Sequence, residues 1–217
     1  MIRYLIVPGW KGSPAAHWQS HWQHSLPGSA RVEQADWLNP CRDRWIAELD
    51  RTIAMSAQPT ILIAHSLGCI TIAHWAAQAS MDTLQRVRGA LLVAPADVQR
   101  DGCPDALRDF APIPRQALPF PSLLIGSDND AAATAERAIE LGQDWGSETV
   151  ILKGVGHINT QSGHTRWTSG FAYLYHLQHR VAQEALNRPE PRNRTGRTLR
   201  PRSATPIEER SHEHPSR

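Results

Sequence analysis

The sequence predicts a single α/β domain in which a mostly parallel sheet of about six strands carries helices on both faces. Apolar, strand-like runs alternate with helix-like segments along residues 1–187, which is typical of this class. One of these runs leads through a sharp serine turn directly into a helix. The chain has 217 residues, of which 41% are hydrophobic, so it is long enough for one such domain and short for two.

The first two strands and two helices follow from local pattern. The first strand, Ile2–Val7, is apolar and ends at Pro8-Gly9, and a short helix is expected over Ala15–Ser25. A weaker strand follows at Ala30–Glu33. A second helix is expected over Asn39–Met55, because its apolar residues recur at helical spacing and form one face: Trp45, Ile46, Leu49 and Ile53.

The third strand and the helix behind it enclose the most informative feature of the chain. Thr60–Ala64 is an apolar strand, Leu67–Ala79 is a helix, and Ser66 lies in the turn between them. This is the sequence form of a nucleophile elbow, in which strained backbone crowds the positions two before and two after the serine. Those positions hold Ala64 and Gly68, both small, although glycine is usual at each. The alternative is a buried strand and helix with an incidental serine.

The remaining elements continue the alternation. Gly89–Val93 and Ser122–Gly126 are the fourth and fifth strands, and Ala131–Leu141 is a helix of alanines and charged residues. Glu148–Leu152 is the sixth strand, and a closing helix runs from Trp167 to about Leu186.

A serine hydroxyl becomes a good nucleophile only when a histidine removes its proton and a carboxylate orients that histidine. In the elbow-containing class these groups follow the order serine, acid, histidine, each after a strand. His157 follows the sixth strand in a glycine-containing loop. Three acids precede it, namely Asp97, Asp128 and Asp130. We favour Asp130, which can cap the following helix while its loop reaches His157; the alternative is that Asp130 is only that cap.

An acyl-transfer site also needs backbone N–H groups that bind the developing oxyanion. One would come from Leu67, directly after the serine, and the other from Gly9 or Trp10 in the glycine-rich loop after the first strand. A phosphate-binding loop is excluded here because the GxxxxGK[ST] pattern is absent. Only about two dozen residues, from Ala96 to Pro121, separate the fourth and fifth strands. This leaves no room for a large lid, so we expect a small, open and partly aromatic acyl pocket.

Composition restricts the compartment and the cofactors. Cys41, Cys69 and Cys103 lack paired metal-binding spacing, no signal peptide or membrane span is recognisable, and a cytoplasmic protein with reduced thiols is expected. His17, His21 and His24 share one helical face, but no glutamate or third ligand accompanies them, so no metal and no cofactor is predicted. The tryptophans fall within helices, which favours packing over nucleic-acid binding.

The charge of the chain is uneven. Residues 188–217 contain eight arginines and four glutamates, a net charge of +4, which leaves about −2 for residues 1–187 given the overall +2. This segment is rich in proline and poor in large apolar residues, so we expect a disordered Pro/Arg-rich tail after an enzyme domain of residues 1–187. Binding of the tail to a nucleic acid or to an acidic partner is an alternative role.

Several strings resemble the YdeN-like serine hydrolases, relatives of the retinoblastoma-binding protein 9 hydrolases. They extend to about Arg180 and are VPGWKGSPAAHWQ, VEQADWLNPCRDRWIAELD, ILIAHSLGCITIAHWA, ALLVAPADV, LLIGSDND, DWGSE and KGVGHINTQSG. The resemblance implies an α/β-hydrolase fold and a triad of Ser66, Asp130 and His157. In the family the acid usually precedes a proline and an aromatic residue, whereas Ala131 and Ala132 follow it here, which keeps Asp128 in reserve.

Together these features predict a cofactor-free serine hydrolase that cleaves small ester or amide substrates through an acyl-enzyme on Ser66. The substrate would be a small molecule, with no nucleic acid and no membrane as partner, and the oligomeric state is left open. The rival hypothesis is a catalytically silent protein that keeps the hydrolase fold as a binding module.

Overall fold

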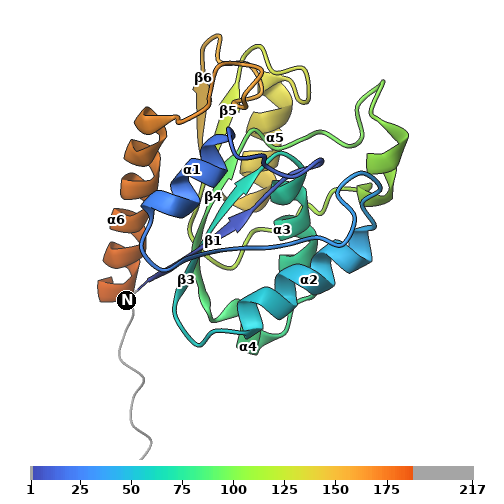
Figure 1. The fold of residues 1–217 in the computed structure, drawn as a ribbon. Coiled ribbons are helices and arrows are strands. Elements are labelled where there is room, and N and C mark those ends of the chain that lie inside the picture. The colour runs from blue at the N-terminus through green and yellow to red at the C-terminus, as the bar shows by residue number, and fades with distance from the viewer. Residues whose placement is uncertain (1, 188–217) are drawn as a thin grey trace, which may run out of the picture. The chain divides into compact units, whose positions relative to one another are not determined.

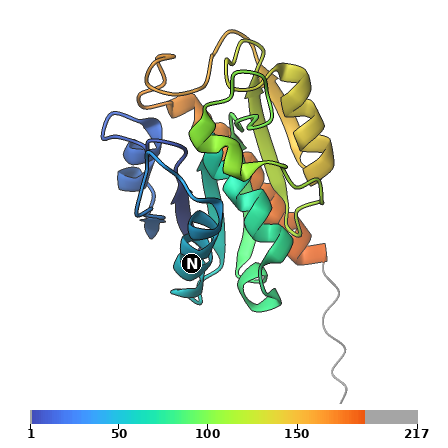
Figure 2. The same cartoon turned by 90° about the vertical axis from the view of Figure 1, so that its right-hand side faces the viewer.

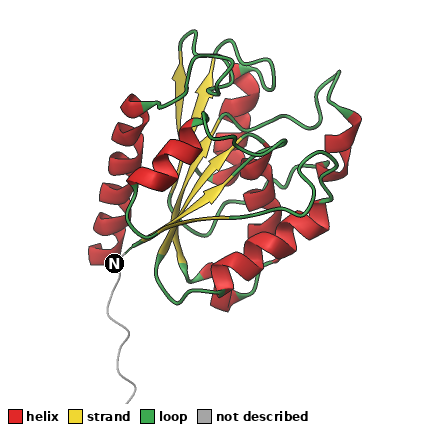
Figure 3. Cartoon of the chain, viewed as in Figure 1, coloured by secondary structure: helices red, strands yellow, loops and turns green. Residues whose placement is uncertain are grey.

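The computed structural model describes residues 2–187, so the predicted tail at 188–217 lies outside the described residues. Six strands form one sheet in the order β2-β1-β3-β4-β5-β6, and each neighbouring pair is parallel (Figure 3). The predicted fold class is therefore confirmed. The strands are β1 (Arg3–Val7), β2 (Ser29–Arg31), β3 (Thr60–His65), β4 (Val87–Val93), β5 (Ser122–Ser127) and β6 (Glu148–Leu152).

Helices cover both faces of this sheet (Figure 1). The α-helices are α1 (Trp18–Ser25), α2 (Arg42–Ala54), α3 (Leu67–Gln78), α4 (Met81–Leu84), α5 (Ala135–Trp145) and α6 (Phe171–Asn187). Two short 3-10 helices are η1 (Asp105–Phe110) and η2 (Thr168–Gly170). No described helix has the length and apolarity needed to cross a membrane.

Alternation along the strands divides the buried side chains into two cores. Leu5 and Val7 of β1 pack with residues of α2, α3 and α5 on one face, whereas Tyr4 and Ile6 pack with α1 and α6 on the other. Figure 2 turns the layer of α2, α3 and α5 toward the viewer. Since β3 lies at the centre of the sheet and is buried on both faces, whatever follows β3 is held by a rigid support.

The predicted elements differ from the observed ones mainly at their ends. The largest difference is α5, which begins at Ala135 and not at Ala131, because the hydroxyl of Thr134 accepts from the Arg137 N–H and makes Thr134 the N-cap. The helix α2 begins after Pro40 and Cys41 instead of at Asn39. The short α4 and η1 were not predicted.

The chain between β4 and β5 contains η1 as its only helix within the described residues, and it forms no separate lid domain. It passes over the carboxyl end of the sheet, where it contributes Ala96, Arg100, Pro104 and Leu107 to the wall of a cavity. In parallel sheets, the carboxyl ends of the strands are the usual position of a site.

Candidate active site

Ser66 occupies a strained turn between β3 and α3. Its backbone dihedral angles are φ 54° and ψ −121°, a region that residues other than glycine rarely adopt. The Ser66 N–H donates to the carbonyl of Val93 at the end of the neighbouring β4 at 3.0 Å, which fixes the turn against the sheet. The predicted strand, turn and helix are therefore present, and the serine hydroxyl lies above the strand ends.

Two glycines allow other backbone segments to approach this turn. A Cβ added at Gly68 would lie 2.3 Å from the carbonyl oxygen of Val7, so α3 can start this close to β1 only without a side chain there. A Cβ added at Gly9 would lie 2.8 Å from the Cβ of Ser66. The loop after β1 therefore passes directly against the serine. Ala64 lies inside β3 and packs in the core, so its methyl group does not obstruct the turn.

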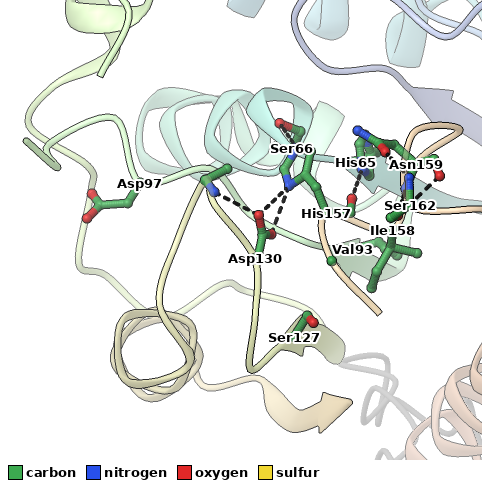
Figure 4. A network of polar contacts seen from close by, with 12 residues as sticks. His65, Ser66, Val93, Asp97, Ser127, Asp130, His157, Ile158, Asn159 and Ser162 are labelled. Atoms are coloured by element: carbon green, nitrogen blue, oxygen red, sulfur yellow. Dashed lines mark hydrogen bonds and ion pairs between the residues drawn. The ribbon is translucent and has the colours of Figure 1, made fainter. Parts of the chain in front are cut away.

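Ser66, His157 and Asp130 form one hydrogen-bonded chain (Figure 4). The Nε2 atom of His157 lies 2.9 Å from the Oγ of Ser66, and its Nδ1 atom lies 2.9 and 2.8 Å from the two carboxylate oxygens of Asp130. Because a carboxylate only accepts, Nδ1 carries the proton, and Nε2 is left to accept from the serine hydroxyl. The Asp130 side chain is 2% exposed and that of His157 is 22% exposed, so the carboxylate is shielded from water while the imidazole edge is accessible.

The other two candidate acids have different contacts. The carboxylate of Asp128 accepts from the N–H of Gly154 at 2.7 Å. The carboxylate of Asp97 lies 3.5 Å from the Nε of Arg137 and is directed away from His157 in Figure 4. Asp130 does not cap α5 as expected; it accepts from the Ala132 N–H in a short turn instead. Of the three acids, the structure brings only Asp130 to the histidine.

The loop that carries His157 is fastened by side chains that the sequence reasoning missed. Asn129 accepts from the N–H of Gly156 at 2.7 Å. His65 donates from Nε2 to the carbonyl of His157 at 2.9 Å, and Trp18 donates from Nε1 to the carbonyl of Ile158 at 2.9 Å. The positions of Asn129 and His65, next to Asp130 and Ser66, were a possible signal. Trp18 gave none, because it lies 140 positions from Ile158 in the sequence.

Two buried histidines lie beside His157 and remain neutral. Burial, with a further contribution from His157 and His17, lowers the pKa of His65 well below its usual value. Burial, followed by the nearby charge of Arg31, lowers the pKa of His17 from 6.5 to about 4. The rings of His17 and His65 are 4.9 Å apart, and those of His65 and His157 are 4.8 Å apart. Neither neighbour therefore places a positive charge next to the imidazole of His157 at neutral pH.

The lowered pKa of His17 predicts that acid destabilises the protein. In the unfolded chain His17 takes up a proton as the pH falls through 6.5, whereas in the folded protein it does so only near pH 4. The stability that neutral His17 contributes is therefore complete above pH 6.5 and decreases toward pH 4. Between about pH 7.5 and pH 5, His17 alone should lower the free energy of unfolding by about 2 kcal/mol. His65 acts in the same direction.

Urea unfolding of His17→Asn measures this effect. His17 is the N-cap of α1 and accepts from the Gln19 N–H, and asparagine keeps such an acceptor without titrating. The variant should therefore lose about 2 kcal/mol less than the natural protein over that pH range. The matched control is His24→Asn, an exposed position of the same helix, and it should follow the natural protein. Equal pH dependence for His17→Asn and the natural protein would contradict the assignment.

Three backbone N–H groups close to Ser66 have no acceptor among residues 2–187. They belong to Gly9, Trp10 and Leu67, the residues that the sequence nominated for oxyanion binding. Leu67 is the first residue of α3, and the N–H groups of the first turn of a helix have no acceptor within that helix. Trp10 also lines the cavity over Ser66, so an aromatic ring borders the site as expected.

The cavity over Ser66 has a volume of about 350 Å³ and is open to solvent. Its wall includes Ser66 and His157, together with residues from the β1–α1 loop, the β4–β5 connection and the segment after His157. A second cavity of about 370 Å³ lies along α2 and contains neither a serine nor a histidine. Small-molecule sites of this size are common in proteins.

The histidines of the α1 region do not gather into a metal site in the structure. His17 precedes α1 and packs against His65, while the Nδ1 of His24 contacts the carbonyl of Ser20. Within the described part of the chain, no group of three or more His, Cys, Asp or Glu side chains is arranged to hold a metal ion.

Comparison with known proteins identifies the class to which this fold and elbow belong. The chain has the α/β-hydrolase fold. A YdeN-like hydrolase from Pectobacterium atrosepticum is 32% identical, with a TM-score of 0.72 over 83% of this chain and 92% of that one. The ydeN gene product of B. subtilis is 18% identical, with a TM-score of 0.63 over 81% of this chain and 97% of that one. A thermophilic esterase from Thermogutta terrifontis is 12% identical, with a TM-score of 0.59 over 83% of this chain and 90% of that one.

The sequence also matches the serine hydrolase family over residues 4–176. The chain therefore belongs to the serine hydrolase family, and the predicted resemblance to YdeN-like hydrolases is confirmed. No curated protein matches the sequence significantly. The matched residues include the serine turn and the His157 loop and end within α6.

Proposed function

We propose that this hydrolase cleaves small carboxylic esters or amides through an acyl-enzyme on Ser66. In the first step the Oγ of Ser66 attacks the carbonyl carbon of the substrate while the Nε2 of His157 takes the hydroxyl proton. The carbonyl π electrons move to oxygen, which gives a tetrahedral oxyanion. When this collapses, the bond to the alcohol or amine breaks, and that group leaves with the proton from His157.

The second half of the reaction repeats this chemistry with water. The Nε2 of His157 removes a proton from water, whose oxygen attacks the acyl carbon and displaces Ser66. In both halves Asp130 holds the imidazole in the tautomer that accepts at Nε2 and stabilises the imidazolium that forms. The N–H of Leu67, with that of Gly9 or Trp10, would donate to the oxyanion, a contribution of about 3 kcal/mol per donor in well-organised sites.

The observation that carries the proposal is the chain of hydrogen bonds from Asp130 through His157 to the serine at the strained turn. The three residues come from the ends of β3, β5 and β6, up to 91 positions apart in the sequence. A catalytically silent scaffold has no need of this alignment, whereas a nucleophile depends on it. The likeness to the esterase, at 12% identity, concerns the fold alone.

Labelling with a fluorophosphonate tests the proposal, since this reagent modifies activated serines. The purified full chain should gain one adduct, which peptide mass spectrometry should locate at Ser66. The adduct should disappear in His157→Ala, because the serine then has no base. The matched control is His164→Ala, a nearby loop histidine that contacts Ser162, and it should still be labelled. A folded protein that stays unlabelled would favour the non-catalytic scaffold.

A further inference from the structure

The cavity over Ser66 has an uneven charge. Its wall contains two cationic side chains, Lys11 and Arg100, and no aspartate or glutamate. Asp130 lies behind His157 and is almost completely buried, and the carboxylate of Asp97 faces Arg137. The surface that a substrate would meet is therefore positive, although residues 1–187 together carry a slightly negative charge.

Arg100 is half-buried and has no carboxylate partner among the described residues. One edge of its guanidinium is held, because Nη1 donates to the carbonyl of Asp97 at 3.0 Å. This contact uses one of five N–H groups, so the others remain for a ligand. A guanidinium that is fixed in this way loses little further freedom when it binds an anion.

Lys11 approaches the cavity from the loop after β1. Its backbone has a φ of 66°, an unusual conformation for a residue other than glycine, and its N–H donates to the carbonyl of Trp37 at 3.0 Å. Its ammonium lies 4.2 Å from the centre of the Trp10 ring, and it has no carboxylate partner within residues 2–187. The contact with the Trp10 ring keeps this charge beside the cavity, which both residues line.

The two cationic residues belong to loops that follow the strands on either side of β3. Ser66 follows β3, and the neighbours of β3 in the sheet are β1, whose loop carries Lys11, and β4, whose connection carries Arg100. A substrate whose carbonyl lies over Ser66 would therefore extend past one or both of them. Resting on the proposed hydrolase function, we propose that this site selects esters that carry a carboxylate or another anionic group, which Arg100 and Lys11 bind.

Two matched ester pairs test the proposal and distinguish the side that carries the charge. The half-ester of glutarate with 4-nitrophenol is compared with 4-nitrophenyl valerate, so that a carboxylate replaces a terminal methyl on the acyl side. The second pair, 4-acetoxybenzoate and its methyl ester, places the charge on the leaving group. In at least one pair kcat/KM should favour the anionic ester by about tenfold or more, and added salt should lower this preference.

Variants connect the preference to the two residues. In Arg100→Gln and in Lys11→Gln, the ratio of anionic to neutral kcat/KM should fall several-fold, and in the double variant it should approach one. Arg100→Lys should retain part of the preference, which a role confined to packing would not explain. Arg108→Gln is the control, since Arg108 lies in the same connection but pairs with Asp105 and does not line the cavity.

Two results would overturn the inference: no preference for either anionic ester, or a preference that is unchanged in the double variant. If these occur while neutral esters are still hydrolysed in a Ser66-dependent way, the hydrolase proposal stands and the anion site fails. If none of the four esters is hydrolysed, the hydrolase proposal and this inference fail together.

Discussion

Ser66→Ala should lower kcat for ester hydrolysis by on the order of 10⁴-fold or more. The variant keeps the elbow, because alanine is no larger than serine and meets the same backbone strain at φ 54°. It loses only the oxygen that lies 2.9 Å from the Nε2 of His157. Without this oxygen His157 has no hydroxyl to activate and no acyl-enzyme can form. Only oxyanion binding and substrate positioning remain to accelerate the reaction.

Steady-state kinetics with a neutral 4-nitrophenyl ester measures this loss. Circular dichroism and the midpoint of thermal unfolding should show that the variant is folded. A matched control is Ser162→Ala, which removes a hydroxyl from the turn after His157 but not from the hydrogen-bonded chain to Asp130. If purified Ser66→Ala retained most of the activity, Ser66 would have no part in the mechanism.

Asp130→Asn should lower kcat by about 10³- to 10⁴-fold, mainly by imposing the wrong histidine tautomer. The Oδ1 of Asp130 accepts from the Ala132 N–H at 2.7 Å, and an asparagine oxygen would keep that bond. The amide NH₂ would then face the Nδ1 of His157. Nδ1 would become an acceptor and Nε2 would carry the proton, so that the imidazole could no longer take a proton from Ser66.

The matched control for this substitution is Asp128→Asn, two positions earlier. Asp128 contacts the Gly154 N–H, and asparagine retains an oxygen that can accept from it. Its loss of kcat should therefore be far smaller than that of Asp130→Asn. If Asp128→Asn proved the more damaging of the two, the acid of the site would have been assigned to the wrong residue.

Most of the fold is predictable from the sequence because buried strands and amphipathic helices have local signatures. Glu148–Leu152 was predicted with the bounds of β6, and the strand and helix around Ser66 were predicted to within one residue at each end. The start of α5 was predicted four residues too early, at Ala131 instead of Ala135, because Ala131–Ala133 favour a helix locally. In the structure the backbone of Ala132 makes other hydrogen bonds. Its N–H donates to the carboxylate of Asp130, and its carbonyl accepts from the N–H of Asp97 in the β4–β5 connection.

The candidate site was predictable in its reacting residues but not in its supports. The order of these residues in the chain and their positions after predicted strands indicated Ser66, Asp130 and His157. The contacts of His65 and Trp18 with the histidine loop join residues 92 and 140 positions apart, and no local pattern encodes such separations. The charge of the cavity was also missed, since Lys11 and Arg100 come from different loops.

The fastening of the histidine loop has a consequence for how catalysis begins. Its anchors, Asn129, His65 and Trp18, are side chains of the folded protein that contact the loop backbone directly. In the proposed mechanism the fold itself therefore positions the base, which leaves the free energy of substrate binding to orient the substrate. We therefore expect discrimination among substrates to depend mainly on the shape and charge of the entrance.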